Sequence, residues 1–296
     1  KTYGQVLVFT GTEFSATALP NGETVSAVNI SSTGAAANAS VNGGMGYPVV
    51  ASNASGANGF VASNYNISYA NASLTVNPAP LGISASGVYS GSTRVTPTAF
   101  TVTGLVNGES IDSVGSLVVN HASVASANRV TAINVASGTA DMGNYVLNTS
   151  QNPTAGTATT NNFSMAKAPL VVQADNMAMF IGDTLPVSYN VSYRGFVNGE
   201  TASTASGLSV GTVSNSAGSN ASAGAYTLTP AGWSADNYSP SYVSGSFSVV
   251  AANQLMIQSG ALTGTYGNPT TLAPLSVQYK STGGPVVNLT LASSLG

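Results

Sequence analysis

The chain has 296 residues, only 5% of them charged, and six Lys and Arg against nine Asp and Glu give a formal net charge of −3. So few cations argue against nucleic acid or an anionic membrane surface as partner, because both are bound mainly through clusters of Lys and Arg. Hydrophobic residues make up 43% of the chain and cysteine is absent, which argues against disorder and excludes disulfide bonds.

One four-residue motif, Asn-Gly-Glu-[Ser/Thr], recurs along the chain at nearly equal intervals. Its copies lie 86 and then 91 residues apart: Asn21-Gly22-Glu23-Thr24, Asn107-Gly108-Glu109-Ser110 and Asn198-Gly199-Glu200-Thr201. Asn-Gly readily adopts positive φ, so each copy is predicted to be a tight turn whose Glu and Ser/Thr cap the turn or bond backbone amides. A motif held at this interval indicates a tandem array of one module.

Two further landmarks keep the same phase. An aromatic residue shortly before a glycine opens each module, and the glycines are 87, 91 and 85 residues apart: Tyr3-Gly4, Tyr89-Ser90-Gly91, Phe180-Ile181-Gly182 and Tyr266-Gly267. An Asn-Tyr pair comes late in three modules: Asn64-Tyr65, Asn144-Tyr145 and Asn237-Tyr238. We expect each glycine to form a turn and each tyrosine to fill the core with its hydroxyl at the surface.

The landmarks divide the chain into four modules, residues 1–78, 79–168, 169–253 and 254–296. Two of the three seams between them carry proline, which suits a short, stiff joint, so the modules are predicted to join end to end into a rod. The first module lacks the start of the pattern and the fourth lacks its Asn-Tyr pair. We therefore expect both ends of the chain to cut through modules of a longer protein.

Short runs of β-branched and aromatic residues predict a mainly β protein, in which each module is a small β-sandwich, Ig-like or β-grasp-like. In chain order, the pattern predicts a closing hairpin in the first module, residues 66–69 with 73–76. In the second module it predicts one helical turn at residues 110–114, a long polar loop at residues 148–162, and apolar strand positions at Phe100, Val102, Leu105, Leu117, Val118 and Val119. In the third module it predicts a closing strand at residues 242–250. No run of about 18 apolar residues exists, so no membrane insertion is expected.

Enzyme chemistry and metal binding have few candidate residues. His121 is the single histidine and lies in a polar stretch, so we expect it to be exposed and inert, and no Ser–His–Asp set can recur by module. With no cysteine and one histidine, structural zinc is excluded. Calcium needs clustered carboxylates, whereas Asp175, Asp183 and Asp236 lie far apart in the sequence. We therefore expect no catalytic residue, no metal and no cofactor.

Three surface features leave alternatives open. Asn-x-[Ser/Thr] sequons are numerous, and glycosylation at some of them is a hypothesis. Trp233 and Tyr238 are candidate glycan contacts, because aromatic rings stack on sugars, although a role in the core is favoured for both. The lysines lie at non-equivalent module positions, so a repeated Lys–Asn cross-link is not expected.

In its landmarks the chain resembles the bacterial MBG repeats of the Tyr-Gly-x type, which are found in filamentous-haemagglutinin-like and other surface adhesins. Residues 2–4 and 265–267 resemble the opening of the family pattern, 104–109 and 195–200 its central signature, and 64–81 its closing strands and seam. The first module departs from the central signature at Leu19-Pro20, and Gly91 and Gly182 lack the adjacent tyrosine. The resemblance implies secretion to the cell surface, a role as a stalk or matrix adhesin, and no catalytic residues.

The expected function is therefore a structural segment of an extracellular bacterial adhesin or matrix fibre, which projects or bridges cells. Its expected partners are copies of itself or neighbouring modules of the same chain, meeting along neutral flanks or sheet edges. The alternative is a polysaccharide-binding repeat, in which weak sites at the module joints act together through avidity. The sequence does not predict the ligand, the organism or the length of the parent protein.

Overall fold

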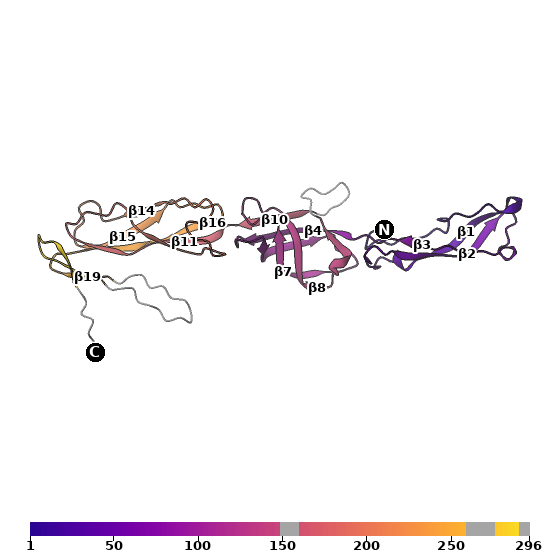
Figure 1. Ribbon diagram of the computed structural model, residues 1–296, viewed down its shortest axis with the longest axis horizontal. Helices are drawn as coiled ribbons and strands as arrows, with labels where there is room; N and C mark the ends of the chain where they lie inside the picture. Colours follow the sequence, from indigo (N-terminus) through magenta and orange to yellow (C-terminus); the bar gives the residue numbers. More distant parts are fainter. Residues whose placement is uncertain (149–159, 259–275, 290–296) are drawn as a thin grey trace, which may run out of the picture. The chain divides into compact units, whose positions relative to one another are not determined.

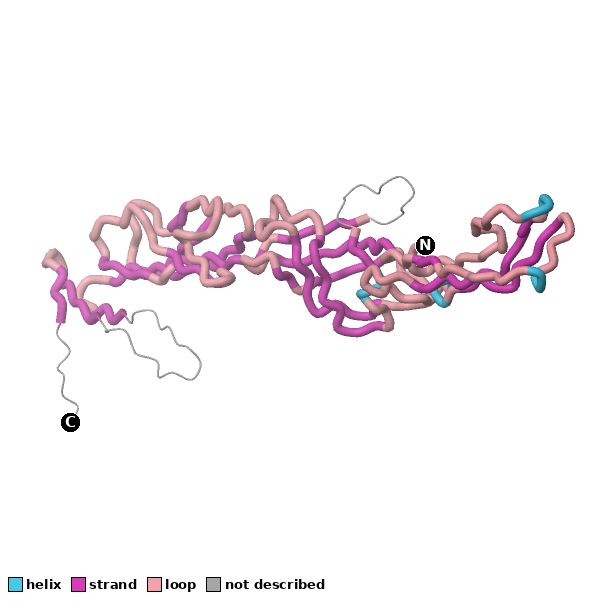
Figure 2. Tube along the Cα trace, turned by 45° about the vertical axis from the view of Figure 1, so that its right-hand side comes forward, coloured by secondary structure: helices cyan, strands magenta, loops and turns pink. Residues whose placement is uncertain are grey.

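The computed structural model describes residues 1–148, 160–258 and 276–289, and the chain divides into two compact units, Lys1–Ala166 and Lys167–Gly296. Strands and loops make up almost the whole trace (Figure 2). Among the described residues, the helical elements are four single 3₁₀ turns: η1 (Pro20–Gly22), η2 (Thr33–Ala35), η3 (Ala62–Asn64) and η4 (Met142–Asn144). In the described part of the chain, no helix has the length and apolarity needed to cross a membrane. The protein is mainly β, as predicted.

Unit 1 begins with an antiparallel sheet in the order β1-β2-β3. The strand β1 (Thr24–Ser31) starts directly after the first Asn-Gly-Glu turn and pairs with β2 (Tyr47–Ala57), whose first residues also pair with β3 (Ala72–Leu74). The predicted hairpin of residues 66–69 with 73–76 is wrong, because residues 66–71 form no strand and β3 takes its hydrogen bonds from β2.

Two further sheets follow in the described part of unit 1 (Figure 1). One has the order β10-β4-β6, with β9 also paired to β4, and the other has the order β5-β7-β8. The sheets contact each other through β6 and β7 and through β8 and β10, so the side chains between them form the core. The bounds are β4 (Ala79–Val88), β5 (Arg94–Val95), β6 (Pro97–Thr103), β7 (Ile111–Val119), β8 (Val130–Gly138), β9 (Tyr145–Leu147) and β10 (Asn161–Ala166).

The strand β4 opens the second module and lies at the centre of its sheet. It pairs antiparallel with β6, and on its other edge it pairs in parallel with β9 and then with β10. Leu81 and Ile83 of this strand are 0% and 1% exposed. Because β4 has a partner on both edges and buries these side chains, it is the strand on which this module is built; we call β4 the opening strand of its module.

The helical turn predicted for residues 110–114 is wrong, because β7 begins at Ile111 and pairs with β8. Ile111 and Val114 are branched at Cβ, which favours strand backbone, and β8 supplies the hydrogen-bonding partners that an isolated turn would lack. The predicted strand positions of this module all lie in β6 or β7 except Leu105, which follows β6 and packs against the core.

Unit 2 repeats this plan around β11 (Ala168–Ala174), the opening strand of the third module. It pairs antiparallel with β13 on one edge and in parallel with β16 on the other, and its Leu170 and Val172 are fully buried. A second sheet has the order β12-β17-β15-β14, and a third has the order β18-β19-β20. The bounds are β12 (Met177–Phe180), β13 (Val191–Arg194), β14 (Thr212–Asn215), β15 (Gly224–Ala231), β16 (Tyr238–Val243), β17 (Gly245–Val250), β18 (Leu255–Gln258), β19 (Ser276–Lys280) and β20 (Val286–Leu289).

The closing strand predicted for residues 242–250 is divided between two sheets, because β16 ends at Val243 and β17 starts at Gly245. A Cβ at Gly245 would lie 2.5 Å from the carbonyl oxygen of Ala174, so the chain passes too close to the opening strand there for any side chain. Most of the polar loop predicted for residues 148–162, and the whole Tyr266-Gly267 landmark, lie outside the described residues.

Candidate functional site

The three Asn-Gly-Glu copies form tight turns with nearly the same backbone. The angle φ is 57°, 56° and 52° at Asn21, Asn107 and Asn198. It is 72°, 73° and 72° at Gly22, Gly108 and Gly199. In each copy the glutamate N–H donates to the carbonyl three residues earlier, at 3.2, 3.1 and 3.0 Å. Two successive residues at positive φ are the conformation that Asn-Gly favours, so this local sequence accounts for the shape of the turn.

The carboxylate of Glu109 accepts hydrogen bonds from two tyrosine hydroxyls, that of Tyr3 at 2.6 Å and that of Tyr145 at 2.5 Å. Tyr3 belongs to the Tyr-Gly pair of the first module, whereas Tyr145 belongs to the Asn-Tyr pair of the second. Their rings meet edge to face with centroids 5.6 Å apart, and the Tyr145 hydroxyl also accepts the N–H of Val106 at 3.1 Å. Three landmarks that are distant in the sequence therefore meet at one carboxylate.

The other two turns repeat part of this arrangement. Glu200 accepts a hydrogen bond from the hydroxyl of Tyr238, which itself accepts the N–H of Val197 at 3.2 Å. Glu23 accepts a hydrogen bond from the hydroxyl of Tyr65 at 2.7 Å. In the first module the residue that corresponds to Val106 is Pro20, which has no N–H to donate. The tyrosine–glutamate bond thus occurs in all three modules, but only two of them can add the backbone amide.

These surroundings keep the tyrosines protonated. The hydrogen bond to Glu109 is the largest cause that raises the pKa of Tyr3 above its ordinary 10.0, and burial adds to it. Burial, followed by the bond to Glu109, raises the pKa of Tyr145 to about 12. Burial and the bond to Glu200 likewise raise the pKa of Tyr238. Each phenol therefore remains a donor to its carboxylate at alkaline pH values at which a free tyrosine begins to ionise.

Asparagine side chains of the second module bond the backbone of the first. The amide nitrogen of Asn107 donates to the carbonyl of Ala37 at 3.3 Å, and the amide oxygen of Asn144 accepts the N–H of Val41 at 2.8 Å. Asn144 is only 3% exposed, so this bond satisfies a buried polar group that would otherwise destabilise the fold. Both asparagines come from the repeated motifs, one from Asn-Gly-Glu and one from Asn-Tyr.

Apolar packing completes the contact between the first two modules, which we call the joint. A Cβ on Gly4 would lie 2.6 Å from a methyl carbon of Val106, so the glycine of the Tyr-Gly pair lets the two backbones approach closely. One buried cluster draws members from both modules: Tyr3, Ala39, Val76, Ala79, Leu81 and Tyr145. The joint is therefore an apolar contact that carries a polar centre at Glu109.

The two candidate glycan contacts lie in the interior of unit 2. Trp233 is 6% exposed and Tyr238 is fully buried. The indole N–H of Trp233 donates to the hydroxyl of Tyr193 at 3.0 Å, and the ring of Tyr238 meets that of Phe196 edge to face. Neither ring is exposed enough for a sugar to stack on it.

The remaining landmark residues have local roles. Gly91 and Gly182 have positive φ of 72° and 80°, as expected of turn glycines, and Gly267 lies outside the described residues. His121 is exposed, and its ring bonds the neighbouring Ser123. In the described ranges, no three His, Cys, Asp or Glu side chains gather as metal ligands would.

Sequence reasoning missed the partnership between the glutamates and the tyrosines. It placed the tyrosine hydroxyls at the surface and the carboxylates on turn amides, whereas the structure joins one to the other. A signal was present, because the separation between glutamate and tyrosine is 42, 36 and 38 residues in the three modules. Two polar residues held at a steady separation in every repeat are candidates for a direct bond.

No curated protein and no solved structure matches the chain. One family model does match, and its family is described as the MBG domain of the YGX type. The matched segment contains most of the opening strand β11, from Leu170 onward, together with the third Asn-Gly-Glu turn and the Tyr238–Glu200 bond. Residues 170–248 therefore match the MBG domain of the YGX type, the family that the repeated landmarks resemble.

Proposed function

We propose that the chain is a structural stalk segment of a secreted bacterial adhesin or extracellular matrix fibre, which projects or bridges cells. The observation that supports this proposal is the joint, where Glu109 bonds Tyr145 of its own module and Tyr3 of the module before it. A carboxylate shared in this way couples two successive modules. The MBG match adds a link to a family of repeat modules, in line with the resemblance to surface adhesins.

The joint has the physical properties that a load-bearing contact needs. Separating the two modules would expose the apolar side chains of the shared cluster and leave Glu109 without the hydroxyl of Tyr3. Hydrogen bonds to charged groups stabilise by about 1.5–3 kcal/mol each, more than bonds between neutral groups. We propose that this coupling serves a mechanical role with no enzyme activity, and that the partners are neighbouring modules or other copies of the chain.

Single-molecule force spectroscopy on the full chain, held at its two ends, tests the mechanical role. We expect discrete unfolding events, and we expect Glu109→Gln to lower the force of one of them because Gln carries no charge. Glu23→Gln is the matched control, since Glu23 accepts the hydroxyl of Tyr65 whereas Glu109 accepts those of both Tyr3 and Tyr145. A chain that extends at low force without discrete events would contradict the stalk proposal.

The extracellular location requires a separate test on the cells that make the protein. Antibodies against the chain should label intact cells or the matrix between them. Labelling that appears only after the cells are opened would contradict the proposal, whatever the force measurements show. The polysaccharide alternative is less favoured, because Trp233 and Tyr238 are buried, and binding to a glycan array would restore it.

A further inference from the structure

A hollow of about 380 Å³ lies on the sheet β5-β7-β8 of the second module. None of its lining residues belongs to the apolar cluster at the joint, so the hollow is a separate feature of this module. Six residues from all three strands line it: Arg94, Ser116, Val118, Ala132, Ile133 and Asn134.

Strand pairing brings five of these residues to one face of the sheet. Val118 lies opposite Arg94 in β5 and opposite Ala132 in β8. In a neighbouring row, Ser116 lies opposite Asn134. Side chains two residues apart on a strand share a face, so the two rows lie on the same side of the sheet. The residues on either side of Val118 in β7 are buried, so this side is the outer face.

Arg94 is the single charged residue in the lining, and it is exposed. Its guanidinium donates to the hydroxyl of Ser116 at 2.9 Å, a bond that uses one of its five N–H donors and holds the side chain at the hollow. Among the described residues, the one ion pair joins Lys280 to Asp183, so no described carboxylate neutralises Arg94. The hollow therefore offers a guanidinium to an anion from outside the chain.

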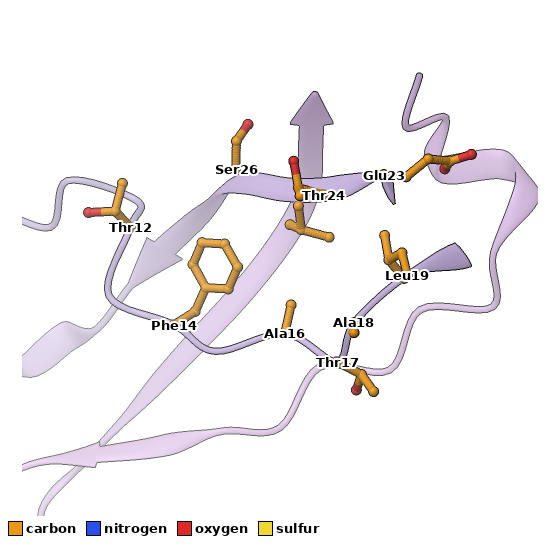
Figure 3. Close-up of a pocket in the computed structure, with 10 residues that line it drawn as sticks. Thr12, Phe14, Ala16, Thr17, Ala18, Leu19, Glu23, Thr24 and Ser26 are labelled. Atoms are coloured by element: carbon orange, nitrogen blue, oxygen red, sulfur yellow. The ribbon is translucent and has the colours of Figure 1, made fainter. Parts of the chain in front are cut away.

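The first module has a hollow of similar size whose charge is opposite. It measures about 370 Å³ and lies between residues 12–19 and β1 (Figure 3). Its single charged lining residue is Glu23, whose carboxylate accepts the hydroxyl of Tyr65 at 2.7 Å. An anion would be repelled by this carboxylate but attracted by Arg94, so the two hollows differ in the sign of the ligand that they favour.

We propose that the hollow of the second module binds a uronate, the acidic sugar unit of a polysaccharide. The planar carboxylate of a uronate matches the guanidinium of Arg94, which can donate two parallel hydrogen bonds to it. The amide of Asn134 and the hydroxyl of Ser116 both donate and accept hydrogen bonds, as the hydroxyls of a sugar do. Val118 and Ala132 supply a small apolar surface for the C–H groups of the sugar ring.

The lining favours a sugar over an acidic segment of a protein. Protein partners gain most of their binding energy from large side chains that fill desolvated pockets. Here the apolar side chains opposite each other are short, and Val118 is half-buried while Ala132 is exposed, so they form a shallow surface. One guanidinium balances the single charge of a uronate, and the other lining residues are neutral.

The site is specific to the second module. When the modules are aligned at their turn glycines, Arg94 corresponds to Leu7 in the first module and to Leu185 in the third. Neither leucine can bind a carboxylate, so this is one site and not a repeated one that acts through avidity. The inference does not depend on the stalk role, since a chain that fails to bind the sugar could still unfold in discrete steps under force.

Titration of the full chain with trigalacturonate, followed by NMR of the backbone amides, tests the proposal. We expect saturable shift changes in β5, β7 and β8 and none around Glu23. The methyl ester of the same trisaccharide, which carries no charge, should bind at least tenfold more weakly, and so should the peptide acetyl-Glu-Glu-Glu-amide, which carries three carboxylates. Equal binding of the ester or of the peptide, or shift changes that leave β5, β7 and β8 unaffected, would overturn the proposal.

A matched pair of variants places the sugar at the hollow. Arg94 lines the hollow, whereas Arg129 of the same module does not, and both are exposed. Arg94→Gln should weaken the binding of trigalacturonate at least tenfold, and Arg129→Gln, which removes the same charge, should bind as the unchanged chain does. Arg94→Lys keeps the charge without the paired donors and should weaken binding several-fold. Equal effects of Arg94→Gln and Arg129→Gln, with the fold checked by circular dichroism, would show that the hollow is not the binding site.

Discussion

The turns at Glu23 and Glu109 have nearly the same backbone but different bonding. Their asparagines differ by 1° in φ and so do their glycines, and both glutamates accept a tyrosine hydroxyl from their own module. Glu109 also accepts the hydroxyl of Tyr3 from the module before it. In addition, the hydroxyl of Tyr145 accepts a backbone N–H that Pro20 cannot supply to Tyr65.

The comparison of the two turns shows that the local motif determines the backbone of the turn, whereas its surroundings determine the hydrogen bonds at the glutamate. Asn-Gly sets the turn wherever it occurs, because positive φ at two residues is a local preference. The number of bonds at the carboxylate depends on what the neighbouring segments bring to it. A repeat of this kind can therefore keep one turn throughout and vary the strength of the contact around it.

The largest expected effect comes from removing the carboxylate of Glu109. Glu109→Ala leaves two largely buried tyrosines, Tyr3 and Tyr145, without their acceptor, and should lower the free energy of unfolding of unit 1 by about 2–4 kcal/mol. Glu23→Ala removes one bond at a more open place and should cost several-fold less. Urea denaturation of the full chain and of both variants measures this difference.

Equal losses of stability in Glu109→Ala and Glu23→Ala would contradict the ranking of the two sites. Glu109→Gln distinguishes charge from shape, because Gln can still accept one hydroxyl at a similar distance. We expect its loss of stability to lie between that of Glu109→Ala and zero. A loss as large as that of alanine would mean that the negative charge carries the whole effect.

Alkaline pH should weaken the Glu109 site. Because folding raises the pKa of Tyr145 from 10.0 to about 12, the folded state holds this proton more tightly than the unfolded state. The stabilisation is fully present below pH 10 and is lost as the pH rises toward 12, by at most about 1.4 kcal/mol per pH unit. Denaturation at several pH values should show this slope, and Tyr145→Phe should reduce it, leaving the part that the raised pKa of Tyr3 contributes. A slope that is unchanged in Tyr145→Phe would assign the effect to other groups.

Much of the fold followed from the sequence, because repeated landmarks carry local conformations. The Asn-Gly pairs, the turn glycines and the β-branched runs predicted turns and strands from residues close together in the chain. The failures all involve distant partners. Residues 66–69 match a strand in pattern but form none, and the predicted turn at residues 110–114 instead pairs with β8 from Ile111 onward. Pattern alone does not show which strand supplies the hydrogen bonds.

The candidate site was less predictable than the fold, for the same reason. The sequence shows Glu109 beside a turn and Tyr145 in a late pair, but their bond depends on the path of the chain between them. Tyr3 is further still, 106 residues from Glu109, and belongs to another module. Only the steady separation of glutamate and tyrosine within each repeat pointed to a contact.

The backbone amide that distinguishes the two turns can be removed. Val106→Pro deletes the N–H that bonds the Tyr145 hydroxyl at 3.1 Å and puts the proline ring against that oxygen, so it should cost roughly 2–3 kcal/mol. The reverse change, Pro20→Val, supplies an N–H near the hydroxyl of Tyr65 and should stabilise the first module slightly. Thermal unfolding of both variants measures the pair. A neutral Val106→Pro would show that this amide does not contribute to the site.

The smallest expected effect is also the one that should be equal at the two turns. Gly22 and Gly108 have φ of 72° and 73°, and a Cβ added at either would meet no atom within 4 Å. Alanine at either position is therefore strained by its backbone alone, at roughly 1–2 kcal/mol. Gly22→Ala and Gly108→Ala should lower stability by similar amounts in urea denaturation, although the glutamate variants at the same two turns differ. A much larger loss for Gly108→Ala would mean that the turn backbone, and not only its side-chain bonds, is coupled to the joint.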